Sequence, residues 1–126
     1  MSRLVMIDSS AWTRALRQRG DPQIRDRVQG HLNDQTAAWC EMVRLELWSG
    51  VRNDLERRGM ERLDYTIPRL PIDDSTWHAA AAYASKARAS GVTVPATDLL
   101  IFACAKAFGA AIIHVDRHFD MLEQLK

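Results

Sequence analysis

The chain has 126 residues, of which 17 are basic and 16 acidic, so it is long enough to bury a core of its own and its net charge is only +1. A charge so close to zero argues against a protein that binds nucleic acid through a uniformly basic surface. No stretch reaches the length of a membrane span, the first residues lack the composition of a signal peptide, and two cysteines are too few for a disulfide framework. We therefore expect a single domain over residues 1–126 that works in the cytoplasm and does not contact a membrane.

The first apolar run organises the rest of the chain. Leu4 to Ile7 is a short, continuous apolar stretch, which is typical of a strand buried on both faces of a parallel sheet, and it ends at Asp8. We expect Ser9 or Ser10 to cap the helix that follows. Ligands of open α/β sheets bind beyond the carboxyl ends of the strands, so Asp8 is a candidate site residue.

Strands and helices alternate through the remainder of the chain. Helical spacing, capping residues and glycine stops predict helices over residues 10–19, 21–33, 41–51, 53–63, 73–91, 98–108 and 116–126. Apolar runs predict strands over 35–40 and 110–115, and a short edge strand, interrupted by Pro68, over 65–70. The alternation indicates the α/β class, a three-layer sandwich in which helices cover both faces of a mostly parallel sheet of four to five strands.

Four acidic residues occupy places from which they can reach one edge of this sheet. Asp8 ends the first strand, Asp98 begins a helix and Asp116 follows the last strand. Glu46 lies among apolar and small neighbours within the helix over 41–51, where a carboxylate without a partner is costly. Four converging carboxylates repel one another, and a hard divalent cation such as Mg²⁺ or Mn²⁺ would neutralise them. The residues therefore predict a metal site.

The segments that hold these acids, VMIDSSAW, VRLELWSG, PATDLLIFACA and AIIHVDRHF, together resemble the PIN domain, and most closely the VapC-type toxin ribonucleases of bacterial toxin–antitoxin pairs. The resemblance extends over nearly the whole chain. It implies endonucleolytic cleavage of RNA by a water molecule that one or two Mg²⁺ or Mn²⁺ ions activate. It implies that the catalytic and metal-holding acids are Asp8, Glu46, Asp98 and Asp116. It also implies a cognate VapB-like antitoxin and a homodimer.

The same resemblance suggests supporting roles for three more residues. Ser10 would hydrogen-bond to the carboxylates and orient them, and Asp120 would be a fifth acid near the site. Thr97 would either support the acids in the same way or cap its helix, and we favour the cap.

The helix over 41–51 is the expected contact for the antitoxin. Met42, Leu45 and Trp48 form an apolar stripe along it. We expect Met42 and Leu45 to lie in the core, and Trp48, two residues past Glu46, to be the anchor that receives the partner, because tryptophan is enriched among interface hot spots.

Three other interpretations compete with this one. A non-catalytic α/β module could hold a protein or RNA through its arginine-rich helices, and Mn²⁺ calorimetry separates it from a metal-dependent enzyme. A phosphotransfer or dehalogenase-like hydrolase with Asp8 as its nucleophile needs a second acid where Ser10 stands. A zinc site between His114 and His118 lacks the closed ligand set of structural zinc.

Overall fold

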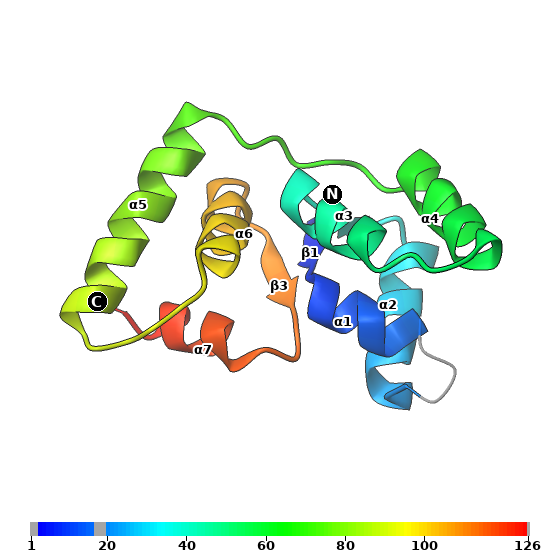
Figure 1. Ribbon diagram of the computed structural model, residues 1–126, viewed down its shortest axis with the longest axis horizontal. Coiled ribbons are helices and arrows are strands. Elements are labelled where there is room, and N and C mark those ends of the chain that lie inside the picture. The colour runs from blue at the N-terminus through cyan, green and yellow to red at the C-terminus, as the bar shows by residue number, and fades with distance from the viewer. Residues whose placement is uncertain (1–2, 17–19, 126) are drawn as a thin grey trace.

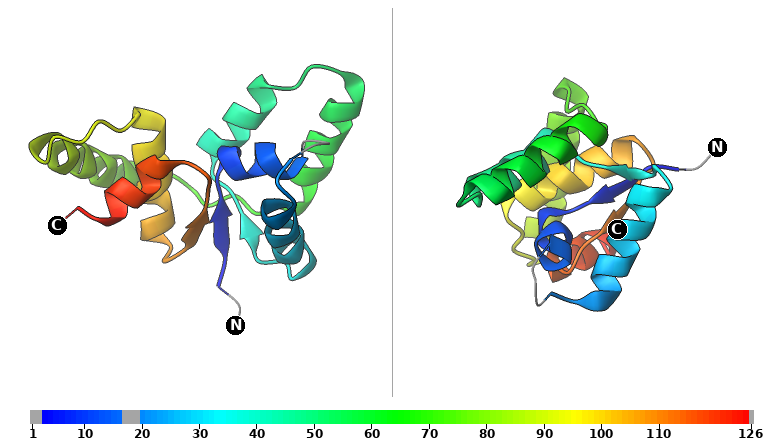
Figure 2. Two further views of the ribbon diagram at one scale, coloured as in Figure 1. Left: turned by 90° about the horizontal axis from the view of Figure 1, so that it is seen from below. Right: turned by 90° about the vertical axis from the view of Figure 1, so that its right-hand side faces the viewer.

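The computed structural model describes residues 3–16 and 20–125, which form seven helices and three strands (Figure 1). In chain order they are β1 (Val5–Ile7), α1 (Ser9–Leu16), α2 (Pro22–Asn33), β2 (Ala37–Ala38), α3 (Glu41–Ser49), α4 (Asp54–Thr66), α5 (Asp74–Ala89), α6 (Ala96–Ala107), β3 (Ala111–Ile113) and α7 (Arg117–Glu123). Helices α5, α6 and α7 lie at the β3 end of the sheet, and α1 to α4 lie at the opposite end, towards β1 and β2 (Figures 1 and 2). The α/β class predicted from the sequence is confirmed.

The sheet is parallel and its strand order is β2-β1-β3. Val5 lies opposite Ala37 on one side and Ala111 on the other. The backbone N–H of Asp8 donates to the carbonyl of Ile113 at 2.9 Å, so the pairing of β1 with β3 continues to the point where both strands end. The chain moves to opposite sides of β1 for β2 and β3, and such a switch point is where open α/β sheets bind ligands.

Helix α6 is the centre of the core. Every residue from Asp98 to Ala105 is buried, and the helix packs against α3, α5, α7 and β3. Trp12 of α1 and Trp39, directly after β2, are fully buried and pack against each other with ring centroids 6.0 Å apart. None of the helices in the described residues is long and apolar enough to cross a membrane.

The predicted sheet of four to five strands is wrong in its strand number, because the edge strand expected over 65–70 does not form. Helix α4 continues to Thr66, and what remains of the strand is a single bridge between Trp39 and Arg69. Pro68 has no N–H to give to a ladder and contributes only its carbonyl, which accepts from the backbone N–H of Trp39 at 3.2 Å. The strand over 35–40 is also shorter than predicted, since Gln35 has a φ of 58° and the chain turns there.

Two expected helix caps are wrong. Helix α1 begins at Ser9, and the carboxylate that accepts from its first turn belongs to Asp8 rather than to either serine. Helix α6 begins at Ala96 after Pro95, whose φ of −58° suits a helix start and whose carbonyl accepts from the N–H of Leu99. Thr97 is already inside the helix and is not its cap. The end predicted for the first helix, residues 17–19, lies outside the described residues.

Candidate active site

The four predicted acids meet in one cavity of about 640 Å³ at the carboxyl ends of β1 and β3. They come from separate segments of the chain: Asp8 directly after β1, Glu46 from α3, Asp98 from α6 and Asp116 directly before α7. The cavity is also lined by Ser9, Ser10, Thr13, Arg14, Val115 and Arg117. The topology of a parallel sheet brings these segments together, as the sequence predicted.

Asp8 is held rigidly at the floor of this cavity. Its side chain is buried, and Oδ2 accepts from the backbone N–H of Ser10 at 3.0 Å and from the Ser10 hydroxyl at 2.6 Å. The same hydroxyl oxygen accepts from the N–H of Val115 at 3.2 Å, which joins the end of β1 to the end of β3. The other carboxylate oxygen, Oδ1, is buried and finds no hydrogen-bond partner among the described residues. A buried charged oxygen in that state is costly unless a cation or a proton approaches it.

Glu46 extends from α3 towards the same cavity. Its Oε1 accepts from the Ser9 hydroxyl at 3.1 Å, which ties the middle of α3 to the first residue of α1. Burial raises the pKa of Glu46, and the charges of Asp8 and Asp116 raise it further, against the opposing effect of the Ser9 hydrogen bond. Glu46 therefore holds a proton more readily than an exposed glutamate does.

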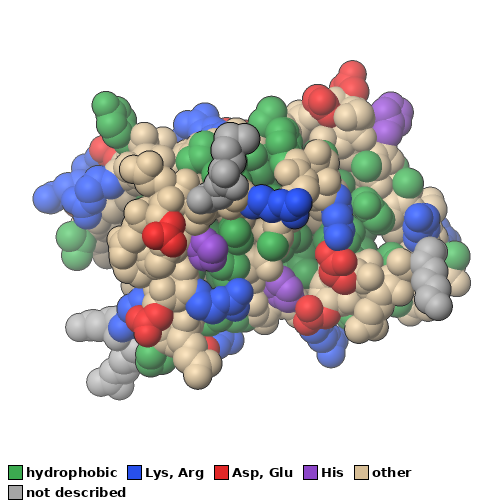
Figure 3. Space-filling view, turned by 180° about the vertical axis from the view of Figure 1, so that it is seen from behind, with side chains coloured by type: hydrophobic (Ala, Val, Ile, Leu, Met, Phe, Trp, Pro, Cys, Tyr) green, Lys and Arg blue, Asp and Glu red, His purple; other side chains and the backbone are tan. Residues whose placement is uncertain are grey.

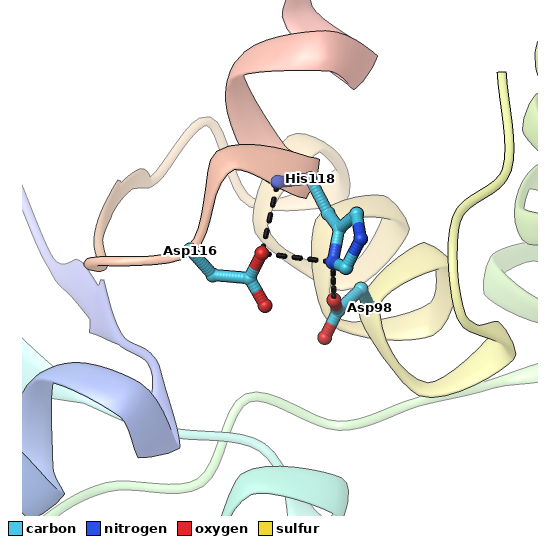
Figure 4. Close-up of side chains that lie close together, drawn as sticks. All are labelled: Asp98, Asp116 and His118. Atoms are coloured by element: carbon cyan, nitrogen blue, oxygen red, sulfur yellow. Dashed lines mark hydrogen bonds and ion pairs between the residues drawn. The ribbon is translucent and has the colours of Figure 1, made fainter.

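Asp98 and Asp116 face each other across the ring of His118 (Figure 4). The Nδ1 atom of His118 lies 3.0 Å from Asp98 Oδ2 and 2.8 Å from Asp116 Oδ1. Asp116 is also the N-cap of α7, and its Oδ1 accepts from the backbone N–H of His118 at 2.9 Å. The first turn of α7 thus positions both the carboxylate and the imidazole.

The two carboxyl groups of this pair differ in their affinity for protons. Burial raises the pKa of Asp98 to about 7, and the neighbouring charges of Asp116 and Asp8 act in the same direction. Burial alone would raise the pKa of Asp116 as well, but hydrogen bonds from the His118 amide and from the Asp98 carboxyl outweigh it and the pKa is lowered. Asp98 is therefore the member of the pair that keeps a proton near neutral pH, and Asp116 the member that is ionised.

Three other predicted site residues lie outside the lining of this cavity. Thr97 is half-buried within the first turn of α6. Asp120 has a 70% exposed side chain that faces His114 Nε2 at 3.5 Å. Trp48 is half-buried on α3 and donates its indole N–H to Asp64 at 3.1 Å.

The contact of Trp48 belongs to a network that fastens α3 to α4. Arg44 makes a two-point ion pair with Asp64, with Nε at 2.5 Å from Oδ1 and Nη2 at 2.8 Å from Oδ2. Arg44 accounts for most of the lowering of the pKa of Asp64. Leu45, in contrast, is 61% exposed, so its expected place in the core is wrong, whereas Met42 is partly buried against the core as expected. The apolar stripe of Met42, Leu45 and Trp48 could not indicate from the sequence that α4 covers the side of α3 that holds Arg44 and Trp48.

Sequence reasoning missed His118 as a member of the site and also the cavity-lining residues Thr13, Arg14 and Arg117. The signal for His118 was its place two residues after an N-cap aspartate, because the amide at that position turns back to the cap and brings its side chain along. Thr13 follows Ser9 by four residues, and Arg14 follows Ser10 by four, so each pair shares one face of α1.

The comparisons with known proteins agree with this geometry. The family model for the PIN domain matches residues 5–124. VapC ribonuclease Mb1587 of Mycobacterium bovis and ribonuclease VapC11 of Mycobacterium tuberculosis are each 35% identical to the chain, over 97% of the chain and 93% of the relative.

Solved structures share the fold at lower identity. FitAcB from Neisseria gonorrhoeae has a TM-score of 0.73 at 19% identity, covering 95% of this chain and 94% of that one. VapBC2 from Rickettsia felis, bound to a DNA fragment from its promoter, has a TM-score of 0.76 at 10% identity, covering 97% and 92%. VapBC-5 from Mycobacterium tuberculosis, a member of the VapBC family of toxin–antitoxin systems, has a TM-score of 0.69 at 19% identity, covering 98% and 93%. Identities this low bear on the fold alone.

Proposed function

Because the chain belongs to the PIN-domain family and, within it, to the VapC ribonucleases, we propose that it is an endoribonuclease toxin that hydrolyses RNA phosphodiester bonds with the help of a divalent metal. The observation that carries this proposal is the convergence of four carboxylates from separate segments on one cavity: Asp8, Glu46, Asp98 and Asp116.

The residues present fit a hard divalent cation, for which we propose Mg²⁺ or Mn²⁺. Asp8 Oδ1 is buried with no hydrogen-bond partner in residues 3–16 and 20–125, and burial, together with the neighbouring acids, raises the pKa values of Glu46 and Asp98. Asp8, Asp98 and Asp116 would hold the ion, with Glu46 completing the set, since carboxylates are the ligands that such ions favour. When bound, the ion activates water as a nucleophile and stabilises the charge that develops on the phosphate.

The chain's own residues position the catalytic carboxylates and accept a proton. The Ser9 and Ser10 hydroxyls fix Glu46 and Asp8, so these carboxylates need little rearrangement when the substrate arrives. Glu46 has a raised pKa in the metal-free protein, and an oxygen of its carboxylate that does not contact the ion could accept the proton of the attacking water.

The RNA backbone would be held by arginines at the cavity rather than by a basic region extending over the whole surface. On the face shown in Figure 3, basic and acidic side chains are interspersed and do not form one basic region. Arg14 and Arg117 line the cavity itself and are exposed, and neither forms an ion pair with a carboxylate of the described residues. Two guanidinium groups beside four carboxylates suit a phosphate that approaches the acids.

We also propose that a cognate VapB-like antitoxin neutralises this activity and that the chain forms a homodimer. Leu45 is adjacent to Glu46 in sequence and is exposed on α3, and Leu16 is 60% exposed at the end of α1, a helix that packs against α3. Exposed leucines beside a site are suited to receive apolar side chains of a partner. Expression without the antitoxin should therefore be toxic, and harmless expression of an intact, metal-binding protein would count against the toxin role.

The deciding experiment is digestion of total RNA with the full chain, followed by mapping of the cut ends. Cleavage is expected with Mn²⁺ or Mg²⁺, little with Ca²⁺ and none with EDTA. Asp116→Asn should abolish it, while the matched control Asp74→Asn, at an exposed acid in the first turn of α5, should cut like the parent. RNA binding without cleavage, together with no heat of Mn²⁺ binding in calorimetry, would favour the non-catalytic binding module instead.

A further inference from the structure

A histidine nitrogen lies among the acids of the site. His118 points Nδ1 into the space between Asp98 and Asp116, at 3.0 Å and 2.8 Å from one oxygen of each (Figure 4). One ligand atom from each of the three residues lies within 4.8 Å of the others. No other group of three or more His, Cys, Asp or Glu side chains in the described residues has its ligand atoms this close.

These distances are those of neighbouring donors around one ion. An octahedral ion with bonds of about 2.1 Å places adjacent donor atoms about 3 Å apart. Nδ1 stands at that separation from one oxygen of each carboxylate, and the three ligand atoms lie within 4.8 Å of one another, so the three side chains are close enough to share one ion. The other ring nitrogen of His118, Nε2, has no hydrogen-bond partner among the described residues, so no such contact competes with the position of Nδ1 between Asp98 and Asp116.

We propose that His118 is a metal ligand together with Asp98 and Asp116, and that its nitrogen makes the site prefer Mn²⁺ over Mg²⁺. The inference rests on the proposed metal-dependent function of the same cavity. A nitrogen donor adds affinity for first-row transition ions, the series that begins with Mn²⁺, whereas Mg²⁺ retains oxygen ligands and water. A site built of carboxylates alone would have no such preference from its donor atoms.

His118 could instead serve only as a hydrogen-bond donor that holds the two carboxylates apart. The variant His118→Asn separates these roles, because the amide of asparagine stands close to the position of Nδ1. It keeps the capacity to hydrogen-bond Asp98 and Asp116, and its oxygen can still contact an ion, but the imidazole nitrogen is lost.

His114 provides the matched control. Its Nδ1 accepts from the backbone N–H of Asp116 at 3.2 Å, and its Nε2 faces Asp120 at 3.5 Å. Both of its nitrogens are therefore engaged outside the space between Asp98 and Asp116. His114→Asn should leave the metal preference unchanged.

The experiment measures Mn²⁺ and Mg²⁺ affinities of the full chain by competition, and reads the Mn²⁺ ligands by pulsed electron paramagnetic resonance. The parent and His114→Asn should show electron spin-echo modulation from a coordinated ¹⁴N. His118→Asn should lose that modulation, and its Mn²⁺-to-Mg²⁺ affinity ratio should fall by on the order of tenfold. A parent protein that binds Mn²⁺ and cuts RNA without nitrogen modulation, or an unchanged ratio in His118→Asn, would overturn the role of His118 alone. Failure of the parent to bind either ion would overturn the proposed function as well.

Discussion

The hydroxyl of Ser10 donates to Asp8 Oδ2 at 2.6 Å, and this short contact decides which oxygen of Asp8 is left without a hydrogen bond. With Oδ2 engaged by Ser10, Oδ1 is left as the buried oxygen without a partner in the described part of the chain. Asp8 also contributes to the raised pKa values of Glu46 and Asp98. The metal-free site therefore stores electrostatic repulsion that a cation would relieve.

The first prediction is that Asp8→Asn abolishes RNA cleavage and stabilises the metal-free fold. The neutral amide removes one charge from the cluster, and in EDTA the melting temperature should rise by a few degrees, as a gain of about 1 kcal/mol would produce. Differential scanning calorimetry and the nuclease assay on the same preparation measure both effects.

Ser10→Ala is the companion variant. It keeps every charge but removes the hydroxyl that holds Asp8, so it should lower the melting temperature and reduce cleavage without ending it. An Asp8→Asn protein that melts normally and cuts RNA at the parent rate would remove Asp8 from the mechanism.

The second prediction concerns pH. The pKa of Asp98 rises from 3.8 to about 7 on folding, so between these values the folded protein holds a proton that the unfolded chain has lost. The free energy of unfolding of the metal-free protein should therefore fall as pH rises from about 4 to about 7, with a slope of about 1.4 kcal/mol per pH unit from this group at most. The raised pKa of Glu46 acts in the same direction. The lowered pKa of Asp116 acts in the opposite direction, but only near and below pH 3.8.

Urea denaturation in EDTA at pH 5, 6 and 7 tests this slope. Asp98→Asn should flatten it, because the variant has no proton to lose at this position. A parent protein whose stability is constant or increases over this range, with no change in Asp98→Asn, would show that the Asp98 carboxyl is ionised in the folded state at pH 5.

The site was more predictable from the sequence than the sheet. Asp8 and Asp116 follow apolar runs whose ends a parallel sheet must place together, and Glu46 stood out as a carboxylate among apolar neighbours. Their convergence followed from topology alone. The metal preference that we assign to His118 could not be predicted in this way, because it depends on the first turn of α7 folding back on Asp116.

The errors came from contacts that are distant in sequence. The first two residues of the expected edge strand, Tyr65 and Thr66, belong to α4 instead, and Asp64 near the end of that helix is held by Arg44, twenty positions earlier. The exposure of Leu45 had the same cause, since its helical spacing with Met42 could not show which side of α3 is covered by α4. Local periodicity identifies an apolar stripe but not the element that covers it.

The third prediction is that Arg14→Gln and Arg117→Gln weaken RNA binding more than chemistry. Each variant should raise KM several-fold with a smaller change in kcat, because these side chains line the cavity and contact phosphate in the proposed complex. The slope of the logarithm of binding affinity against the logarithm of salt concentration should become less negative by about 0.7 for each arginine removed.

Arg58→Gln, at an exposed position of α4 outside the cavity, is the control and should keep the parent slope. Equal salt slopes in all three variants would place the RNA elsewhere.

The last prediction separates two candidates for the antitoxin contact on α3. Trp48 donates its indole N–H to Asp64 and packs against the core, so Trp48→Ala should lower the melting temperature as well as any affinity for the antitoxin. Leu45 is largely exposed and adjacent to Glu46, so Leu45→Ala should leave the melt unchanged and weaken binding of the cognate antitoxin by about 1–2 kcal/mol. Calorimetric titration of antitoxin into each variant, with Leu55→Ala as a control at another exposed leucine, on α4, measures the difference. If Trp48→Ala loses more than about 2 kcal/mol of affinity at an unchanged melting temperature, Trp48 is the anchor and its contact with Asp64 contributes little to the fold. If Leu45→Ala binds like the parent, the antitoxin does not lie across this side of α3.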